Sequence, residues 1–292
     1  KDKSLKNPIE SLPGQFQLGQ KEYLNEIGEC LKLGINTFVL FPAIPERFKN
    51  KKATYSYADD NFYLSAIRTI KKLFPEAVLM SDVAMDPYSS DGHDGLVEDG
   101  KILNDESVEV LVDMGLSHVE AGADFLAPSD MMDGRILSLR EALEDEGYHD
   151  TGIMSYSAKY ASAFYGPFRD ALDSAPVDMK NVPKDKKTYQ MDFANRFEAI
   201  RETEMDIGEG ADIVMVKPGL CYLDIVREIK NEVDVPVAVY QVSGEYAMLK
   251  AAAEKGWLDH DAVMMEQLIA MKRAGADIIA SYFAKDVVRV LG

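Results

Sequence analysis

The stretch Ala211-Asp-Ile-Val-Met-Val-Lys-Pro-Gly219 carries a single lysine at the end of an apolar run. A short apolar run that ends in a Pro-Gly turn predicts a buried strand with Lys217 at its carboxyl end. Because apolar neighbours penalise the ammonium form, we expect a lowered pKa for Lys217 and some free amine able to attack a carbonyl. The alternative is a lysine whose ammonium simply reaches water from the strand end. A second lysine in a comparable setting, Lys159, favours the chemical interpretation.

Short runs rich in β-branched or aromatic residues alternate with longer amphipathic segments along the rest of the chain. This alternation predicts repeated βα units and a parallel sheet. The predicted strands are 35–41, 77–83, 125–128, 152–156, 212–216, 235–241 and 277–283. The predicted helices lie near 21–33, 61–74, 107–122, 135–146, 192–208, 223–231, 245–255 and 261–275.

Seven strands are one fewer than a (β/α)₈ TIM barrel needs. We predict this α/β fold as a single domain over 1–292 and expect the missing first strand before Lys1, because the chain opens in a loop followed by a helix. The alternative is an open doubly wound sheet, but no Gly-x-Gly-x-x-Gly turn follows any strand. Polar residues at the strand ends favour the barrel, since barrel active sites form at the carboxyl ends of strands. These residues are Asp82, Ser129, Asp130, Tyr156, Lys159, Lys217, Ser243 and Tyr282.

The balance of charge argues against some classes of partner. The 292 residues include 32 basic and 50 acidic side chains, a net charge of −18, which repels nucleic-acid phosphates and anionic lipid. We therefore expect neither a nucleic-acid partner nor a membrane partner. The first residues lack the apolar region of a signal peptide, and the two cysteines, Cys30 and Cys221, provide no disulfide framework. These features predict a soluble, cytoplasmic protein.

The strand before Lys159 directly precedes the strand of Lys217 in the predicted order. Neighbouring barrel strands would bring the two amines close together, and their mutual repulsion would disfavour double protonation. Such a pair suits a reaction on two carbonyl groups. We expect the site to be walled by the aromatic residues Tyr160, Phe164, Tyr165 and Phe168.

Across essentially the whole chain, the sequence resembles the porphobilinogen synthase family, also called 5-aminolevulinate dehydratase. The segments that carry the resemblance are Ser129-Asp-Met-Met-Asp-Gly-Arg135, Tyr165-Gly-Pro-Phe-Arg-Asp170, Met215-Val-Lys-Pro-Gly219, Tyr222-Leu-Asp-Ile-Val-Arg227 and Tyr240-Gln-Val-Ser-Gly-Glu-Tyr246. The resemblance implies a TIM-barrel lyase that joins two molecules of 5-aminolevulinate into porphobilinogen, with loss of two waters. This reaction belongs to the synthesis of tetrapyrroles such as haem and chlorophyll.

The resemblance also implies roles for individual residues. Lys217 would form a Schiff base with the substrate that supplies the propionate side, and Lys159 would form the second with the substrate that supplies the acetate side. Asp82 matches a carboxylate near the substrate amines that could assist proton transfer. The implied contacts are Arg169, Lys186 and Gln190 on the acetate side, and Ser243 and Tyr282 on the propionate side.

Some of these residues have simpler interpretations on their own. Without the resemblance, Ser243 is explained equally well as a turn residue and Arg169 as a surface arginine. A keto acid entering a strongly acidic protein does, however, need local cations, and Arg169 offers a bidentate fork.

The metal pattern departs from the zinc-dependent members of this family. Where those members have three cysteines, this chain has Ala84, Asp86 and Asp94. Without thiolates, the segment offers hard oxygens and His93, so we expect no active-site zinc, and either magnesium or no active-site metal. The individual roles of Asp86, Asp91, His93 and Asp94 stay open. The glycines of this segment suggest a lid that excludes water.

The resemblance places a second, allosteric magnesium at Glu202, held largely through retained waters, in a homo-octamer. In the family the octamer depends on an N-terminal arm, which we expect, like the first strand, before Lys1. The alternative is that the acidic run around Glu202 is a solvated helix face. Two other functions stay open for the whole chain: a barrel that binds a keto acid without turnover or acts as a scaffold, and a Schiff-base aldolase that needs only one lysine.

Overall fold

The computed structural model describes residues 3–177 and 179–292, which fall into two compact units. Unit 1 comprises Lys1–Asn36, Ser162–Ala171 and Val216–Gly292, and unit 2 comprises Thr37–Ala161 and Leu172–Met215. The boundary runs through strand β9 (Ile213–Lys217), so both units share that strand. The prediction of a single domain over 1–292 stays a prediction.

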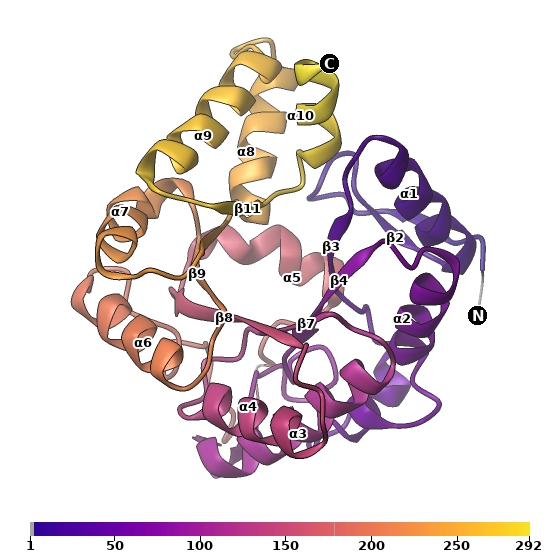
Figure 1. The fold of residues 1–292 in the computed structure, drawn as a ribbon, viewed down its shortest axis with the longest axis vertical. Coiled ribbons are helices and arrows are strands. Elements are labelled where there is room, and N and C mark those ends of the chain that lie inside the picture. Colours follow the sequence, from indigo (N-terminus) through magenta and orange to yellow (C-terminus); the bar gives the residue numbers. More distant parts are fainter. Residues whose placement is uncertain (1–2, 178) are drawn as a thin grey trace. The chain divides into compact units, whose positions relative to one another are not determined.

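Unit 2 is built on a parallel sheet that follows the chain order (Figure 1). Its strands are β3 (Thr37–Leu40), β4 (Val78–Val83), β7 (Phe125–Pro128) and β8 (Gly152–Lys159), followed by the first residues of β9. The register pairs Leu40 with Ser81 and Val83 with Pro128. Strand β8 is almost wholly buried, as expected for a parallel strand covered on both faces.

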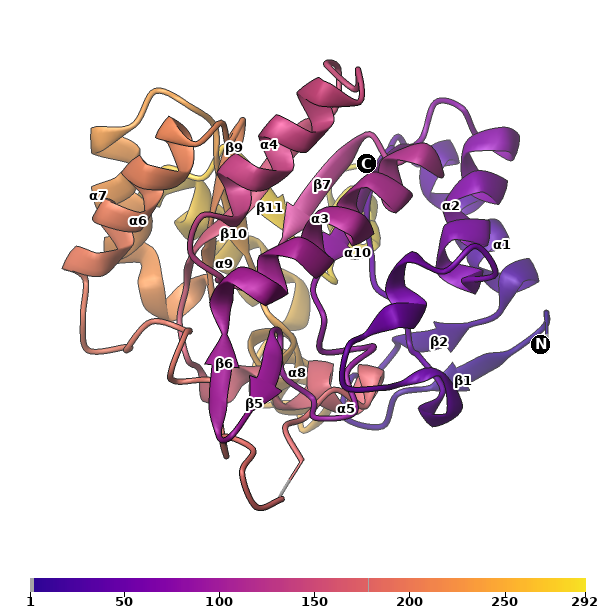
Figure 2. The same cartoon turned by 90° about the horizontal axis from the view of Figure 1, so that it is seen from below.

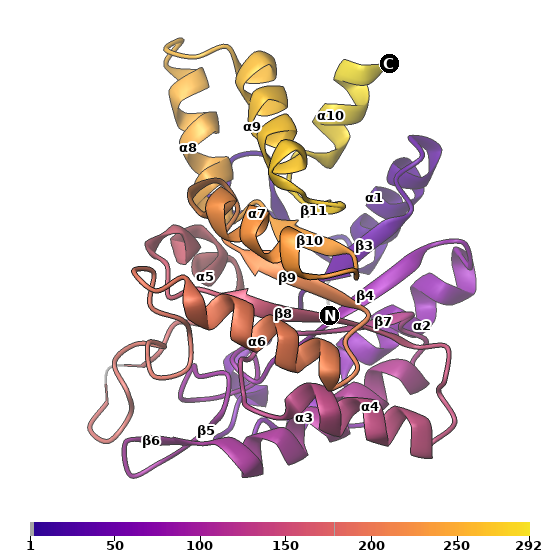
Figure 3. The same ribbon diagram turned by 60° about the vertical axis from the view of Figure 1, so that its left-hand side comes forward.

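Helices connect the strands of unit 2 in the predicted order. They are α2 (Phe62–Leu73), α3 (Asn104–Glu120), α4 (Arg135–Asp145) and α6 (Phe197–Gly208). Helix α3 packs against α4, and α6 packs against β8 (Figure 3). The short 3₁₀ helices η1 (Glu46–Phe48) and η2 (Thr54–Tyr57) precede α2.

Unit 1 continues the same alternation of strand and helix. Strand β10 (Val237–Tyr240) pairs in parallel with β11 (Ile278–Ala280). The helices are α1 (Gln20–Lys32), α5 (Gly166–Leu172), α7 (Leu223–Glu232), α8 (Ser243–Glu254), α9 (His260–Ala274) and α10 (Ala284–Leu291), with η3 (Ala163–Tyr165) and η4 (Leu220–Tyr222). Helices α8 and α9 lie side by side in Figure 3 and enclose a core that includes Tyr246, Met264 and Phe283.

The seven parallel strands lie in the order β3-β4-β7-β8-β9-β10-β11, and each falls on a strand predicted from the sequence. This order and the helices between the strands confirm the predicted α/β fold class, the TIM barrel. The strand boundaries differ from the predicted ones by a few residues, and β8 extends past the predicted run 152–156, so that Lys159 is its last residue. Helices α5 and α10 were absent from the predicted set.

Two antiparallel hairpins also went unpredicted. They are β1 (Lys6–Pro8) with β2 (Phe16–Leu18), and β5 (Leu96–Glu98) with β6 (Lys101–Leu103). Figure 2 shows β5 and β6 leading into the start of α3. The turn between them, Asp99-Gly100, has φ of 48° and 77°, which is the left-handed pair that an Asp-Gly hairpin turn requires. That dipeptide was a usable signal in the sequence.

Within the described ranges, no helix combines the length and the apolar character needed to cross a membrane.

His118 is a titratable group buried in the core of unit 2. It lies in α3 fully buried, and its ring packs edge-on against Tyr63, with ring centroids 5.1 Å apart. Among the described residues, neither of its ring nitrogens has a hydrogen-bond partner. Burial lowers the pKa of His118 from 6.5 to about 3. Below pH 6.5, His118 therefore binds a proton in the unfolded chain but not in the folded chain. The free energy of unfolding consequently decreases as the pH falls.

We predict that His118→Phe flattens this acid sensitivity. Between pH 6.5 and 5, the free energy of unfolding of the wild type should fall more steeply than that of the variant, by up to about 1.4 kcal/mol per pH unit. Urea denaturation at a series of pH values measures both slopes. His149→Gln, at a largely exposed histidine, is the control. Equal slopes in the wild type and His118→Phe would contradict the prediction.

Candidate active site

Lys217 ends strand β9 in unit 1 and is 6% exposed. Its Nζ lies 4.5 Å from the ring centroid of Tyr240 and 5.2 Å from those of Tyr165 and Phe168. Such contacts attract the ammonium to the ring faces and exclude water from it. Tyr165 also donates a hydrogen bond to the Lys217 carbonyl at 3.2 Å. Tyr165 and Phe168 thus wall the lysine as predicted, and Tyr240 is a third wall that the sequence analysis missed.

Ser243 and Tyr282 form hydrogen bonds with the aromatic residues around Lys217 or with their backbone, within unit 1. Ser243 is the first residue of α8; its Oγ accepts from the Phe168 N–H at 3.0 Å and donates to the Phe164 carbonyl at 3.3 Å. The hydroxyl groups of Tyr282 and Tyr240 lie 3.3 Å apart, and burial raises the pKa of Tyr282 to about 12. The Tyr282 hydroxyl therefore stays protonated near neutral pH, and it can donate a hydrogen bond, as the Ser243 hydroxyl can.

Arg169 stands next to Phe168 on α5. Its guanidinium carbon lies 6.0 Å from the ring centroid of Tyr165, at the limit of a cation–π contact. Unit 1 therefore brings four of the predicted site residues into one linked set: Lys217, Ser243, Tyr282 and Arg169.

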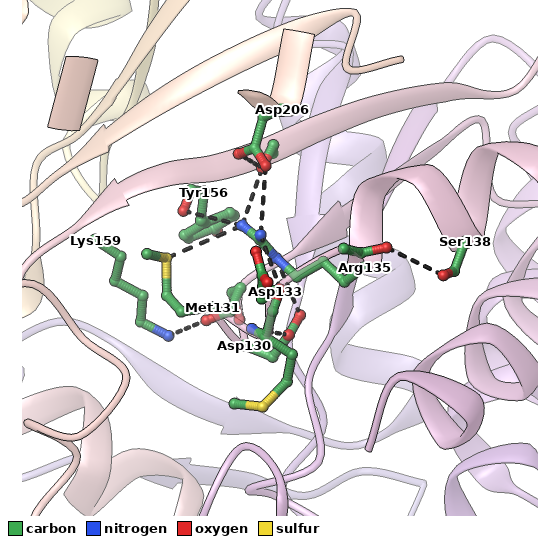
Figure 4. Close-up of polar contacts among 12 residues, drawn as sticks. Asp130, Met131, Asp133, Arg135, Ser138, Tyr156, Lys159 and Asp206 are labelled. Atoms are coloured by element: carbon green, nitrogen blue, oxygen red, sulfur yellow. Dashed lines mark hydrogen bonds and ion pairs between the residues drawn. The ribbon is translucent and has the colours of Figure 1, made fainter. Parts of the chain in front are cut away.

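Lys159 is the corresponding lysine of unit 2, at the end of β8 and 6% exposed. Its Nζ donates a hydrogen bond to the carbonyl of Ser129 (Figure 4). The Ser129 hydroxyl in turn donates to the Asp82 carboxylate at 2.7 Å. Ser129 thus links two predicted site residues, Lys159 and Asp82, across the ends of β8, β7 and β4. The sequence analysis placed Ser129 at a strand end but gave it no role.

Lys186 is held by two carboxylates in unit 2. Its Nζ lies 3.0 Å from Asp86 Oδ2 and 2.9 Å from Asp94 Oδ2, and all three side chains are buried. Burial opposes the charge of Lys186, but the two aspartates outweigh it and raise the pKa of Lys186. The resemblance implied that Lys186 contacts the acetate-side carboxylate; in the structure Lys186 is paired with two of the residues that stand where zinc-dependent members have cysteines.

The two aspartates titrate differently. Burial raises the pKa of Asp86, although Lys186 opposes that effect. Burial acts on Asp94 too, but Lys186 and Lys159 outweigh it and hold the pKa of Asp94 well below its usual range. Because Lys159 lowers the pKa of both carboxyl groups, it belongs to the same electrostatic cluster as Lys186.

Gln190 lies close to both lysines of unit 2 through the backbone. Its N–H donates to the Lys186 carbonyl at 2.9 Å, and the next residue, Met191, donates to the Lys159 carbonyl at 3.0 Å. Gln190 is buried, and its side-chain oxygen has no hydrogen-bond partner among the described residues. A buried side-chain amide whose oxygen has no such partner can bind a polar ligand through a hydrogen bond.

Residues 173–177 and 179–191 pack against the segment 84–95 in unit 2. His93 Nε2 lies 2.8 Å from the Pro183 carbonyl, which can only accept, so Nε2 carries the proton and Nδ1 accepts from the Tyr189 hydroxyl at 3.0 Å. Burial lowers the pKa of His93, consistent with a neutral ring. A Cβ on Gly92 would lie 2.2 Å from the Ala175 carbonyl oxygen. These contacts join the two parts of unit 2; that the segment 84–95 acts as a lid stays a prediction.

Glu202 belongs to a second cluster of unit 2, centred on the buried Arg135. Figure 4 shows Arg135 together with Asp130 and Asp206. The guanidinium of Arg135 is fully buried, with Nη1 3.4 Å from Asp206 and 3.5 Å from Glu202, and Nε 3.7 Å from Asp130. Arg135 also donates to the Ser155 hydroxyl at 3.1 Å. Burial raises the pKa of Glu202 and raises that of Asp130 to about 6.

This cluster has the chemistry that a hard cation needs. After burial, neighbouring acidic groups are the main cause of the raised pKa of Glu202, and Arg135 offsets them only in part. A divalent cation beside the Glu202 oxygens would relieve that excess negative charge. In the part of the chain that the structure describes, no three or more His, Cys, Asp or Glu side chains are grouped to hold a metal directly. An ion at Glu202 would therefore keep most of its waters.

Comparison with known proteins gives one consistent family. The family model described as delta-aminolevulinic acid dehydratase matches residues 1–290. The delta-aminolevulinic acid dehydratase of Bradyrhizobium diazoefficiens is 53% identical over 276 residues, covering 94% of this chain and 77% of the relative. The chloroplastic enzyme of rice, Oryza sativa subsp. japonica, is 51% identical over 286 residues, covering 97% of this chain and 66% of the relative.

One solved structure agrees over nearly the whole chain. It is the crystal structure of delta-aminolevulinic acid dehydratase, or porphobilinogen synthase, from Toxoplasma gondii ME49 in complex with the reaction product porphobilinogen. The TM-score is 0.96 at 49% sequence identity, covering 99% of this chain and 82% of that chain.

We predict that Gly92→Ala loosens the contact between the segment 84–95 and the residues around Ala175. Both the added methyl group, which would meet the Ala175 carbonyl, and the positive φ of 70° disfavour alanine here, so residues 173–177 and 179–191 should be displaced at a cost of roughly 1–3 kcal/mol. Limited trypsin digestion should then cut at the exposed lysines of 179–191 several times faster than in the wild type. Gly147→Ala is the matched control, because its φ is 81° and a Cβ there meets nothing within 4 Å. Equal cleavage rates in the two variants would refute the clash.

Proposed function

Because the chain belongs to the delta-aminolevulinic acid dehydratase family, we propose that it is a porphobilinogen synthase, a lyase that condenses two 5-aminolevulinate molecules into porphobilinogen and two waters for tetrapyrrole synthesis. The observation that carries this proposal is the match over residues 1–290, with a buried lysine at the end of β9 and another at the end of β8. Imine chemistry needs amines that are shielded from water in this way.

Lys217 captures the substrate that supplies the propionate side. Its amine adds to the ketone carbon, and loss of the carbonyl oxygen as water leaves an imine. The rings of Tyr165, Phe168 and Tyr240 around Nζ support this assignment, because they keep bulk water from hydrolysing the imine. Ser243 and Tyr282 hold the carboxylate of this substrate as hydroxyl donors.

Lys159 forms the second imine, with the substrate that supplies the acetate side. The Ser129 carbonyl accepts a hydrogen from Nζ and so orients the amine, while Asp82 acts on protons at the substrate amines. Both roles are supported by the hydrogen-bond chain that runs through Ser129. Asp82 is 6% exposed, so a proton held there is kept away from solvent.

Arg169, Lys186 and Gln190 hold the carboxylate of the acetate-side substrate. The raised pKa of Lys186 keeps it charged for this task. Because Lys186 is already paired with Asp86 and Asp94, the substrate carboxylate binds by replacing one of these aspartates. A buried ammonium tolerates such an exchange better than it tolerates the loss of a partner.

We predict that Lys217→Ala lowers turnover by at least about a thousandfold and abolishes borohydride trapping of the first substrate, because the nucleophile is gone. Lys159→Ala should still trap 5-aminolevulinate at Lys217 but form no porphobilinogen. Mass spectrometry of peptides after reduction measures both adducts, with Lys230→Ala as a control at a lysine paired with Asp277.

The same experiment separates the alternatives. Adducts on Lys217 alone, with full activity in Lys159→Ala, would indicate a one-lysine aldolase. A protein that binds 5-aminolevulinate without trapping would be a keto-acid-binding barrel.

The proposal includes a magnesium ion at Glu202, allosteric to the lysines, in a homo-octamer, and no zinc among Ala84, Asp86 and Asp94. When bound, the ion supplies positive charge to an acidic cluster. The half-buried Glu202 carboxylate, whose pKa burial and Asp206 raise, supports this site, because Arg135 offsets the neighbouring acidic groups only in part. Arg135 also reaches Asp130, the neighbour of the Ser129 that holds Lys159, which offers a route from Glu202 to the catalytic lysine.

We predict that magnesium raises the activity of the full-length enzyme severalfold and favours its larger assembly, because the ion offsets repulsion around Glu202. Glu202→Gln should lose this response and still trap substrate at Lys217. Glu204→Gln, at an exposed position of the same helix, is the control and should respond as the wild type does. Activity assays and sedimentation across a magnesium titration give both readouts. An undiminished response in Glu202→Gln would place the activating ion elsewhere.

A further inference from the structure

Glu245 is a fully buried carboxylate in unit 1 that accepts hydrogen bonds from backbone N–H groups of two different segments. Its Oε1 accepts from Leu220 at 2.6 Å, and its Oε2 accepts from Val242 at 2.7 Å and from Gly219 at 3.4 Å. The bond to Val242 is ordinary capping of α8 by the third residue of the helix. The bonds to Gly219 and Leu220 go beyond capping, because these residues lie in the turn that follows β9.

These amides belong to the backbone around two residues of the proposed site. Gly219 and Leu220 begin the turn two residues after Lys217, and Val242 directly precedes Ser243. One carboxylate therefore ties the end of the lysine's strand to the start of the helix that carries the carboxylate-binding serine. Hydrogen bonds from backbone N–H to a carboxylate are charge-assisted and strong, so this link resists deformation.

The packing around this link leaves little room for adjustment. A Cβ on Gly219 would lie 2.8 Å from the Met271 methyl and 3.2 Å from the Tyr240 carbonyl oxygen. A Cβ on Gly244 would lie 2.6 Å from the Phe164 carbonyl oxygen. Gly219 and Gly244 are thus both packed closely against neighbouring backbone atoms. The Phe164 carbonyl that Gly244 approaches also accepts the hydrogen bond of the Ser243 hydroxyl. A shift of the turn cannot be absorbed locally.

The negative charge of Glu245 also affects the titratable groups in the turn that follows β9. Burial and then Glu245 raise the pKa of Cys221, and Glu245 contributes to the raised pKa of Tyr222. Burial raises the pKa of Glu245 itself to about 7, while the backbone N–H donors oppose that rise. The backbone groups around Glu245 are all hydrogen-bond donors. The ionised carboxylate, whose two oxygens can only accept, is therefore the form that these N–H groups stabilise.

We propose that Glu245 is a positioning residue for the condensation: it sets the place of the Lys217 amine relative to Ser243, so that a keto acid held by its carboxylate presents its ketone carbon to Nζ. The inference rests on the proposed function. The effect is one of alignment, because small misplacements of reacting groups cost large factors in rate. It differs from a stabilising role, which would act equally on ketones with and without a carboxylate.

The test compares two ketones in Glu245→Gln. Glutamine keeps the shape but replaces one acceptor oxygen with an NH₂ donor, so the bonds at one oxygen are lost. Borohydride trapping at Lys217 is timed with levulinate, a keto acid, and with 2-pentanone, which has no carboxylate. In the wild type levulinate should be trapped much faster, and in Glu245→Gln this preference should fall at least tenfold.

Two further variants make the test specific. Asp277→Asn is the matched control, because Asp277 ties the Val237 N–H by a carboxylate bond of 2.9 Å at the opposite end of β10. It should lower stability and leave the ketone preference unchanged. Ser243→Ala should itself remove most of the preference, and adding Glu245→Gln to it should change the ratio little, since both act on one alignment.

The outcomes separate the two levels of the argument. If the wild type is not trapped at Lys217, the proposed function fails. If the wild type prefers levulinate and Glu245→Gln keeps that preference, the positioning role is overturned and the function stands. Should Glu245→Gln not fold, Gly219→Ala displaces the same turn without touching the carboxylate, and an unchanged ratio there would equally overturn the inference.

Discussion

The physical constraint on which this structure depends is the burial of a lysine amine at the end of a parallel strand. Lys217 and Lys159 are each only 6% exposed, and an ammonium taken out of water must be compensated by its surroundings. The two lysines are accommodated in different ways. Three aromatic rings face Lys217, whereas Lys159 has a backbone carbonyl and lies within the field of two aspartates. The two buried amines therefore have chemically different surroundings.

The polar groups that support the lysines act mainly through the backbone. Ser129 offers its carbonyl to Lys159 and its hydroxyl to Asp82, and Glu245 accepts from the amides that follow Lys217. The sheet fixes the backbone groups at strand ends, so a side chain that is hydrogen-bonded to them is also held in place. This explains how short connections can hold reactive amines in place. It also explains why glycine is needed at Gly219 and Gly244, where backbone packs directly on neighbouring atoms.

The sequence predicted the strands and the two lysines because both signals are local. The run 211–219 contains its own strand, its turn and its buried lysine, and the repeated alternation sets the fold class. The pairing of Lys186 with Asp86 joins residues 100 positions apart, and no local pattern reports it. The role of Glu245 went unseen for the same reason, since its acceptors serve amides 25 and 26 residues earlier. By contrast, the Asp99-Gly100 hairpin carried a local signal that was overlooked.

The most direct test of the central claim is a crystal structure of the protein after levulinate has been bound and reduced with borohydride. The account predicts continuous density from Lys217 Nζ to the former ketone carbon, with the ligand carboxylate against Ser243 and Tyr282. Density for an intact ketone that is not bonded to Lys217, or an adduct on a different lysine alone, would contradict it.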